Sequence, residues 1–357
     1  MIKSLHIIGS RLLGGAESFY MRLALALHDG GYPTIAMNRQ DSQVAKELQG
    51  KIPLVHGRFS NPWDLITRNK VSRIIKVEQP DIVQTYMTRA TVLTHLRSDS
   101  KAVHIARLGG FYKIKRFAHA HAWVGNTQAI CDYLINGGMP ADKVFYIGNF
   151  VDRPVEQSIE QKRSLAQSLG LPDDALVIMS IGRMIEKKGF QDLLPAFAGL
   201  PAEIKSRPLH LLLVGDGPMR MELEQSTHQL GIGGRVHFTG WQTSTSPYYS
   251  LADIFVCPSR HEPLGNVILE AWSHSLPVVS TDSHGAIELI EDGQNGVLSP
   301  CHDAKALSQR LLNMLGADES LRHQLGCNGY ETVEKNYRPE AVTAAYLQLY
   351  RHLLDQR

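Results

Sequence analysis

Short apolar runs alternate with stretches of helical periodicity through the first half of the chain. In the stretch at 17–30, for example, Phe19, Leu23 and Leu27 recur on one face of a helix. Strands that alternate with helices in this way are typical of a parallel sheet covered by helices. The pattern predicts strands at 4–9, 34–38, 52–55, 81–86, 102–107, 122–125 and 143–147, and helices at 17–30, 62–77 and 127–136.

The rhythm lapses between residues 152 and 162, where polar residues and a proline predict a linker. It then restarts, so we expect an α/β protein with Rossmann-like domains at 1–155 and 156–338, followed by a terminal segment at 339–357. Two such domains would face a cleft lined by the carboxyl ends of their strands. The second half predicts strands at 175–181, 210–214, 235–238, 253–257, 276–280 and 296–298, and helices at 189–199, 218–230, 265–274, 285–291, 303–315 and 339–354.

Proline marks two of the expected helix starts. Asn61 and Pro62 predict a capped start for the helix at 62–77. Pro218, within the sequence VGDGPM, fits the first position of the helix at 218–230.

Composition limits the class of protein. The 357 residues are 43% apolar, which is enough for two cores, and the net charge of +2 gives no argument for nucleic-acid binding. The four cysteines show no CxxC spacing, which is typical of reduced cytosolic thiols. The first residues lack the apolar core of a signal peptide, and no apolar run reaches 18 residues. The sequence therefore predicts a soluble cytoplasmic protein.

The segment at 259–272 carries the clearest chemical signal. An apolar strand at 254–258 leads into a loop with Glu262, and a helix with Glu270 is expected to start near Leu264. The helix N-terminus would offer N–H groups to a phosphate. The two carboxylates, eight positions apart, would face the same cleft two turns apart. This arrangement suits a ligand with a phosphate between two hydroxylated ends.

Two cations follow the first strand of the second half. Arg183 ends this strand, and Lys188 precedes Gly189 at the expected start of a helix. A planar guanidinium and a compact ammonium can together hold a diphosphate. Solvated loop charges are the alternative, but the positions at a strand end and a helix start favour a functional role.

Paired glycines follow the first strand of the chain. Gly14 and Gly15 open the first helix, where the backbone can approach an anionic ligand closely. The loop lacks the GxGxxG pattern of dinucleotide-binding proteins, and a plain strand-to-helix turn is the alternative reading.

Several familiar motifs are missing from the sequence. It has no Asp-x-Asp, no GxSxG and no P-loop, and the pair His119 and His121 has no third ligand nearby. We therefore expect neither a metal site nor a bound cofactor.

Four motifs in the second half resemble the family 4 retaining glycosyltransferases of the GT-B fold, of the type that builds bacterial cell-surface polysaccharide and lipopolysaccharide. The motifs are GRMIEKKG, VGDGPM, FTGW and PSRHEPLGNVILEAW, in that order. Glu262 and Glu270 match the E-x7-E signature of that family. The GGAE loop and residues 148–152 are also similar, so the resemblance covers nearly the whole chain.

The resemblance implies a role for each side chain of these motifs. Arg183 and Lys188 would hold the diphosphate of a nucleotide-sugar donor, Glu270 the ribose, and Glu262 the hydroxyls of the transferred sugar. The last helix would cross back to the N-terminal domain. We also expect Trp241, after the sequence FTG, to lie near the base of the nucleotide. Backbone contacts to the donor are implied for Leu264, Gly265, Asn266, Gly14 and Gly15.

The first half departs from the family pattern. Members usually carry a histidine at the end of a first-domain strand, but here His104 falls within the strand and Arg107 takes the exit position. Arg107 is therefore a candidate substitute close to the reacting centre. The usual Gly-Phe-Gly after the first glutamate is replaced by Pro263, Leu264 and Gly265, which predicts an altered sugar pocket.

The function that these motifs imply is a metal-independent hexosyl transfer with retention of anomeric configuration. A UDP- or GDP-linked sugar would be the donor, and a glycolipid or polysaccharide precursor the acceptor. Another GT-B enzyme (an epimerase or a phosphorylase), a two-lobed binding protein and a non-catalytic sugar-nucleotide sensor are the alternatives.

Peripheral contact with an anionic membrane is a further expectation. The segment at 111–117 mixes aromatic and cationic residues, which suits a membrane surface or a phosphorylated glycolipid. Arg68, Lys70, Arg73 and Lys76 would add to this charge. A solvated face over buried aromatics is the alternative.

Overall fold

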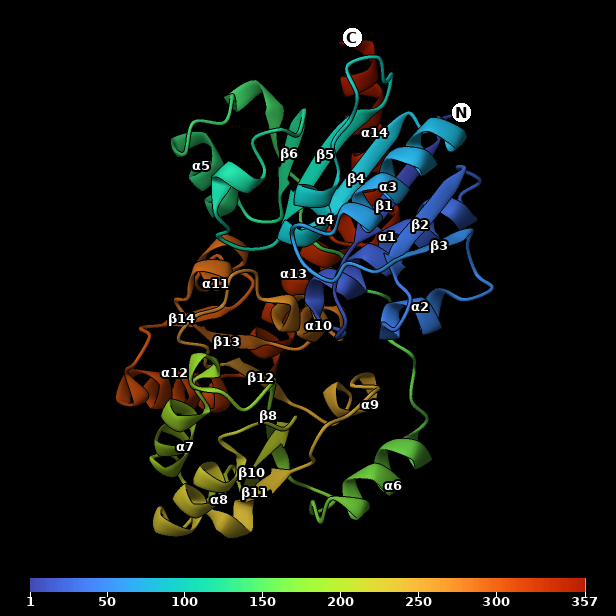
Figure 1. Cartoon of the computed structure of the whole chain (residues 1–357). Coiled ribbons are helices and arrows are strands. Elements are labelled where there is room, and N and C mark those ends of the chain that lie inside the picture. Colours follow the sequence, from blue (N-terminus) through green and yellow to red (C-terminus); the bar gives the residue numbers. More distant parts are fainter. Residues whose placement is uncertain (357) are drawn as a thin grey trace. The chain divides into compact units, whose positions relative to one another are not determined.

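The computed structural model describes residues 1–356, which form two compact units (Figure 1). Unit 1 comprises Met1–Phe150 together with the C-terminal segment from Pro339, and unit 2 comprises Val151–Arg338. Each unit is a parallel sheet with helices packed against it. No helix in residues 1–356 combines the length and apolar character that a membrane span requires.

Unit 1 is built on a sheet with the strand order β3-β2-β1-β4-β5-β6-β7. The order reverses between β1 and β4, which pair with each other in parallel. The strands are β1 (Ser4–Ile8), β2 (Thr34–Arg39), β3 (Leu54–Gly57), β4 (Ile82–Tyr86), β5 (Val103–Leu108), β6 (Ala122–Gly125) and β7 (Val144–Tyr146). The helices are α1 (Gly15–Asp29), α2 (Gln43–Leu48), α3 (Leu65–Glu78), α4 (Met87–Leu93), η1 (Ile114–Arg116), α5 (Gln128–Asn136), η2 (Ala141–Lys143) and α14 (Pro339–Asp355).

The last helix, α14, belongs to the core of unit 1, where Figure 1 shows it in red beside α1 and the strands. Tyr346 and Tyr350 are fully buried in the same apolar cluster as Phe19 of α1. The Tyr350 hydroxyl also donates a hydrogen bond to Gln84 Oε1 of β4 over 2.6 Å. A buried hydroxyl needs such a partner, so α14 is anchored by both packing and a polar contact.

Unit 2 repeats the architecture with the strand order β11-β10-β8-β12-β13-β14. Its order reverses between β8 and β12. The strands are β8 (Leu176–Ile181), β9 (Glu203–Ile204), β10 (Arg207–Val214), β11 (Val236–Phe238), β12 (Ile254–Cys257), β13 (Val278–Thr281) and β14 (Val297–Ser299). The helices are α6 (Ile159–Ser168), η3 (Glu186–Lys188), α7 (Phe190–Ala198), α8 (Arg220–Gln229), η4 (Gly233–Arg235), α9 (Ser246–Tyr249), α10 (Asn266–Ser273), α11 (His284–Leu289), α12 (Ala304–Gly316) and α13 (Glu319–Asn336).

Two predicted helix starts are wrong, because the caps lie further along the chain. The α3 helix begins at Leu65, since the Asp64 carboxylate accepts the N–H of Thr67 over 3.0 Å. Asn61 instead accepts the N–H of Trp63, which is a turn contact. The α8 helix begins at Arg220, two residues after Pro218.

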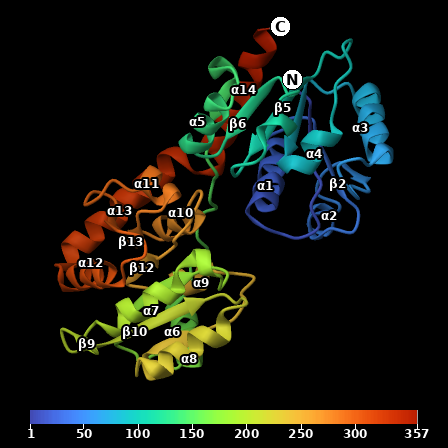
Figure 2. The same ribbon diagram turned by 60° about the vertical axis from the view of Figure 1, so that its left-hand side comes forward.

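The helix α13 was not predicted, although it is 18 residues long. Gly326 and Gly329 lie inside it, and glycine disfavours helix by about 1 kcal/mol. Packing explains both residues: a Cβ on Gly329 would lie 2.2 Å from Trp272, and one on Gly326 would lie 2.0 Å from the Ser275 carbonyl. Figure 2 shows α13 beside α10, the helix that carries Trp272. The helices α2, α4, α6 and α9 and the strand β9 were also not predicted.

Candidate donor site

The loops after β8 and β12 form the candidate donor site of unit 2. These strands are parallel neighbours on either side of the point where the strand order reverses. Ligands of doubly wound sheets bind outside the carboxyl ends of the strands at this point. The loop after β8 carries Arg183 and Lys188, and the loop after β12 carries Glu262. The sequence-predicted residues of these two motifs therefore come from adjacent loops.

Lys188 and Glu262 form an ion pair at the centre of this site. The Lys188 ammonium contacts Glu262 Oε2, and the side chains are 23% and 12% exposed, respectively. Burial lowers the pKa of Lys188, but the carboxylates of Glu262 and Glu270 outweigh this effect and leave the pKa above its ordinary value. A raised pKa keeps the lysine cationic at neutral pH, which suits a diphosphate ligand.

Glu270 lies on α10 and is oriented by a tyrosine. The hydroxyl of Tyr249, at the end of α9, donates to Glu270 Oε2 over 3.0 Å. Because Glu270 also contributes to the raised pKa of Lys188, both carboxylates act on the same ammonium. No pattern in the sequence links Tyr249 to a glutamate 21 positions later, so this contact could not be predicted.

The two loops depend on glycines in the left-handed region of backbone space. Gly189, before α7, has a φ of 72°, and a Cβ there would lie 1.8 Å from the Pro258 carbonyl oxygen. Gly265, before α10, has a φ of 76°. Side chains other than glycine rarely adopt such angles. The close approach at Gly189 is what lets the loop after β8 lie directly against the loop after β12.

Polar contacts fix the same pair of loops. The N–H of His261 donates to the Lys187 carbonyl over 3.1 Å. The Arg260 guanidinium makes two hydrogen bonds to the Asp192 carboxylate on α7, at 2.6 and 2.7 Å. A bidentate pair of this kind is both strong and specific in geometry. Sequence reasoning missed the Arg260–Asp192 pair, which positions the loop that carries Glu262.

The helix start at 264–266 is supported from α11. The N–H of Gly285 donates to the Glu262 carbonyl over 2.7 Å, and a Cβ on Gly285 would lie 2.5 Å from the Leu264 backbone. Leu264 is 7% exposed. The structure thus places Leu264, Gly265 and Asn266 at the N-terminus of α10, in the same loop as Glu262. Gly285 at the start of α11 therefore holds this loop in place.

Arg183 and Trp241 are the exposed members of the predicted set in unit 2. The Arg183 side chain makes no hydrogen bond or ion pair within the described part of the chain, and Trp241 is 71% exposed. The residues just before them, Gly182 and Gly240, both contact Gly215 at the end of β10: Gly215 N–H donates to the Gly240 carbonyl, and a Cβ on Gly215 would lie 2.1 Å from the Gly182 oxygen. The strand ends that carry Arg183 and Trp241 are therefore both packed against the end of β10.

The predicted residues of the first half lie in unit 1. Gly14 and Gly15 are exposed at the start of α1. Arg107 is only 2% exposed: its guanidinium lies 3.6 Å from the Phe19 ring centroid, its Nε donates to the Tyr346 hydroxyl over 3.1 Å, and its Nη2 donates to Asn149. These contacts support a positioning role for Arg107 between α1, α14 and the segment at 147–150. A role at the reacting centre stays a prediction.

His104 is buried within β5, as the sequence predicted. Its Nε2 lies 2.9 Å from the Thr85 hydroxyl. Burial, and to a smaller extent the charge of the nearby His119, holds the pKa of His104 well below its ordinary value. Such a neutral, enclosed imidazole is a core histidine.

Two family models match the chain. The model described as Glycosyltransferase Family 4 matches residues 13–153, and the model described as Glycosyl transferases group 1 matches residues 161–332. Each match falls almost entirely within one of the two units.

Two relatives from Rhizobium meliloti (strain 1021) are similar along nearly the whole chain. The lipopolysaccharide core biosynthesis glycosyltransferase LpsE is 35% identical, over 94% of this chain and 95% of its own length. The lipopolysaccharide core biosynthesis glycosyltransferase LpsD is 31% identical, also over 94% of this chain and 95% of its own length.

Solved structures share the architecture. A glycosyltransferase from Rickettsia africae ESF-5 has a TM-score of 0.86 and 21% identity, with coverage of 100% of this chain and 99% of that chain. Anabaena Alr3699/HepE in complex with UDP-glucose has a TM-score of 0.81 and 22% identity, with full coverage of both chains. The sequence-based expectation of a GT-B fold is confirmed, and the chain belongs to the family 4 glycosyltransferases.

Proposed function

We propose that this glycosyltransferase moves a hexosyl unit from UDP-hexose to a hydroxyl of a lipopolysaccharide core or related glycolipid. One observation carries the donor half of this proposal: Lys188, Glu262 and Glu270 interact beside the N-terminus of α10. The uridine nucleotide is supported by the HepE complexes with UDP and UDP-glucose. The acceptor class is supported by the names of the two Rhizobium relatives.

The chemistry follows from the charge that develops as the glycosidic bond breaks. The leaving diphosphate gains negative charge, and preorganised cations and helix N–H groups stabilise it without further reorganisation. Lys188 supplies a fixed positive charge, and the exposed Arg183 adds a second one. The diphosphate would compete with Glu262 for the ammonium, which leaves Glu262 for the sugar hydroxyls. Glu270 would accept hydrogen bonds from the ribose, and Gly14, Gly15 and Trp241 keep their implied donor contacts.

Retention and metal independence are part of the same proposal. Lys188 and Arg183 supply the charge that a divalent ion supplies in other transferases, and Glu262 is assigned to the hydroxyls of the sugar rather than to nucleophilic attack. We therefore favour front-face attack, in which the departing phosphate helps to deprotonate the acceptor. Proton NMR of the product would report the anomeric configuration directly. An inverted product contradicts retention, and loss of turnover with EDTA contradicts metal independence.

The acceptor site of the proposal lies where the strand order reverses in unit 1. A cavity of about 620 Å³ there is lined by residues that follow β1 and β4, including Ser10, Arg11 and Arg89, and by Tyr112 and Arg116. Cations beside an aromatic ring suit a charged carbohydrate.

Peripheral membrane contact is a separate part of the proposal. Phe111 is 45% exposed, and Lys113 and Lys115 are exposed, whereas Phe117 is fully buried and cannot reach a membrane. Trp63 is 86% exposed and adds an aromatic side chain of the kind found at membrane interfaces. Sedimentation with liposomes that contain or lack anionic lipid tests this contact. Absence of salt-sensitive binding would contradict it.

A panel of UDP- and GDP-sugars tests the activity itself. Thermal shift identifies the donor, because a bound ligand raises the melting temperature. Release of UDP from the same donor then separates an enzyme from a sugar-nucleotide sensor. A donor that stabilises the protein without release of nucleotide, with lipopolysaccharide core present, would contradict the proposal.

A further inference from the structure

A cationic cavity lies at the carboxyl ends of β2 and β3 in unit 1. Its volume is about 660 Å³, and its charged lining residues are Arg39, Asp41, Arg58 and Lys70. Three cations and one carboxylate leave a formal charge of +2 when His56, which also lines the cavity, is counted as neutral. A concave surface with such a surplus concentrates anions.

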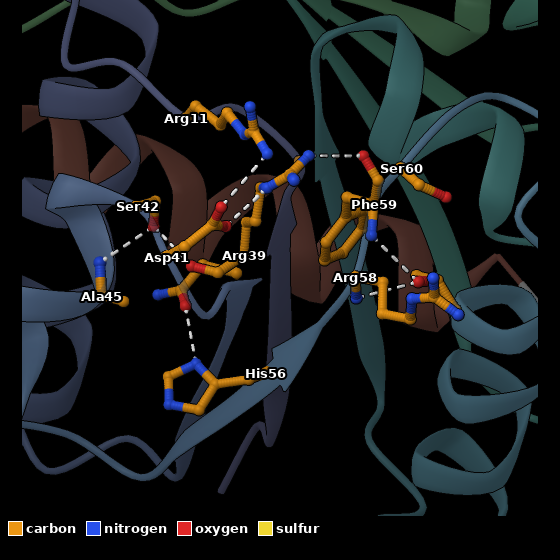
Figure 3. Close-up of polar contacts among 12 residues, drawn as sticks. Arg11, Arg39, Asp41, Ser42, Ala45, His56, Arg58, Phe59 and Ser60 are labelled. Atoms are coloured by element: carbon orange, nitrogen blue, oxygen red, sulfur yellow. Dashed lines mark hydrogen bonds and ion pairs between the residues drawn. The ribbon is translucent and has the colours of Figure 1, made fainter.

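The one carboxylate of the cavity is already shared by two arginines (Figure 3). Arg39 Nε donates to Asp41 Oδ1 over 2.6 Å, and Arg11 Nη2 lies 3.3 Å from Asp41 Oδ2. The Asp41 side chain is 55% exposed, so these pairs are weak. Asp41 therefore cannot also neutralise Arg58 and Lys70.

A strained backbone at Phe59 holds two arginines at this edge of the sheet. Phe59 is fully buried with a φ of 47°, and its ring fills the space where a Cβ on Gly9 or Gly57 would lie, 2.8 and 2.7 Å away. The Phe59 carbonyl accepts from Arg39 Nη1 and Arg89 Nη1, both at 3.1 Å. Strain of this kind is concentrated at ligand clamps. Here it aims one carbonyl at two guanidinium groups.

The backbone of Arg58 is fixed by the start of α3. Thr67 Oγ1 accepts the N–H groups of Arg58 and Phe59 at 3.1 and 3.0 Å, as the dashed lines from these two residues in Figure 3 show, and donates to Asp64 Oδ2 over 2.8 Å. His56 Nδ1 likewise donates to Asn38 Oδ1 over 3.1 Å (Figure 3). The backbone from which the Arg58 side chain extends is therefore fixed before a ligand binds, which lowers the entropy cost of binding.

We propose that this cavity binds the phosphate monoester of a phosphorylated sugar in the acceptor. A phosphate dianion matches the formal charge of the cavity, Arg58 can bond it through a planar fork, and Lys70 adds a point charge. The cavity is distinct from the donor diphosphate site in unit 2 and from the cavity at the reversal of strand order in unit 1. The inference rests on the proposed function, because it assigns the charge of the acceptor.

Calorimetric titration with glucose 6-phosphate as the probe tests the cavity. The full chain is first saturated with UDP so that the donor site is occupied. We expect millimolar binding or tighter, no binding of glucose, and about a tenfold loss of affinity in Arg58→Gln/Lys70→Gln. The matched control is Lys46→Gln/Arg351→Gln, which removes the same charge from exposed positions of unit 1 outside the cavity and should change affinity less than twofold.

Equal affinities in the two double variants would overturn the site, as would a wild-type protein that ignores glucose 6-phosphate. Inorganic phosphate distinguishes a sugar-borne phosphate from the free ion: if it binds as tightly as glucose 6-phosphate, the assignment to the acceptor fails. UDP titrations on the same variants should be unchanged, which shows that they are folded. The calorimetric measurement needs no turnover. Its result is therefore independent of the donor panel, whose failure would contradict only the proposed function.

Discussion

The two units build opposite electrostatic environments on the same kind of sheet. At the carboxyl ends of the strands of unit 2, Lys188 is neutralised by Glu262 and interacts with Glu270. At the corresponding edge of unit 1, Arg39 and Arg89 donate to the Phe59 carbonyl, Arg39 also pairs with the exposed Asp41, and Lys70 lies at an exposed position. Unit 2 therefore keeps its charges balanced in the absence of ligand, whereas unit 1 carries an unbalanced positive charge.

This difference indicates how each site would gain affinity. In unit 2 a ligand must replace an ion pair that is already made, so selectivity depends on close geometry around Lys188 and Glu262. In unit 1 an anion needs to displace only water and Asp41, so affinity should depend on charge and salt. Substitutions in the two units can therefore separate geometry from charge.

The largest effect is expected from Lys188→Ala. If Lys188 faces the leaving diphosphate, as we propose, its loss should lower kcat/KM about 1,000-fold, which corresponds to about 4 kcal/mol of transition-state stabilisation. Steady-state kinetics with the donor found by thermal shift measure it. Lys187→Ala is the matched control, because this neighbour is exposed and only its backbone contacts the site loop. Near-normal turnover of Lys188→Ala would contradict the diphosphate role and remove the contrast between the units.

A second large effect should come from Gly189→Ala, which tests the geometry of unit 2. The new Cβ would collide with the Pro258 carbonyl, so we expect unfolding in urea to show a loss of about 3 kcal/mol. Gly231→Ala is the control in the same unit: its φ is also positive, at 69°, but no atom lies within 4 Å of the new methyl group. Its loss should be only about 1 kcal/mol. Equal losses in the two variants would mean that the close contact between the loops does not contribute to the free energy of unfolding.

The sequence alone predicted the strands, and which side chains of unit 2 come together, better than it predicted the helices or the contacts of the first unit. The site of unit 2 lies in two continuous loops, so Lys188 and the Glu262–Glu270 pair could be identified from local spacing. The helix α13 could not, because only its contact with Trp272 explains its glycines. The cavity of unit 1 draws its cations from separate segments around Arg39, Arg58 and Lys70. No local pattern predicts the strained Phe59 that organises two of its neighbouring arginines.

A stability loss of intermediate size is expected at acidic pH, and unit 1 should lose stability first. Burial lowers the pKa of His6 to about 3 and also depresses that of His104. Because the unfolded chain binds protons near pH 6.5 while these folded imidazoles do not, stability is complete above pH 6.5 and falls as the pH drops below it. His6 alone should cost about 2 kcal/mol between pH 8 and pH 5.

Hydrogen exchange read by mass spectrometry, corrected for the intrinsic effect of pH, can follow the two units separately. In unit 2 burial also lowers the pKa of His210, His237 and His274, but these shifts are smaller than that of His6, so protonation of these side chains should cost less. We expect peptides of β1, β4 and β5 to lose protection before those of β8 and β12. Loss of protection in unit 2 at a higher pH than in unit 1 would contradict the prediction. The variant His6→Asn should bring the pH values at which the two units lose protection closer together.

The smallest effect should come from Tyr249→Phe, which tests how finely unit 2 orients a charge. The variant removes the 3.0 Å hydrogen bond to Glu270 but leaves the ring packed, so the carboxylate loses one constraint and keeps its charge. We expect the KM for the donor to rise about fivefold with kcat nearly unchanged, which is the pattern for lost ground-state binding. Tyr248→Phe is the control, since this hydroxyl makes no hydrogen bond within residues 1–356. If both variants behave alike, Glu270 is held by the helix rather than by Tyr249. If only Tyr249→Phe weakens donor binding, this single hydroxyl accounts for part of the close geometry that distinguishes the site of unit 2 from the cavity of unit 1.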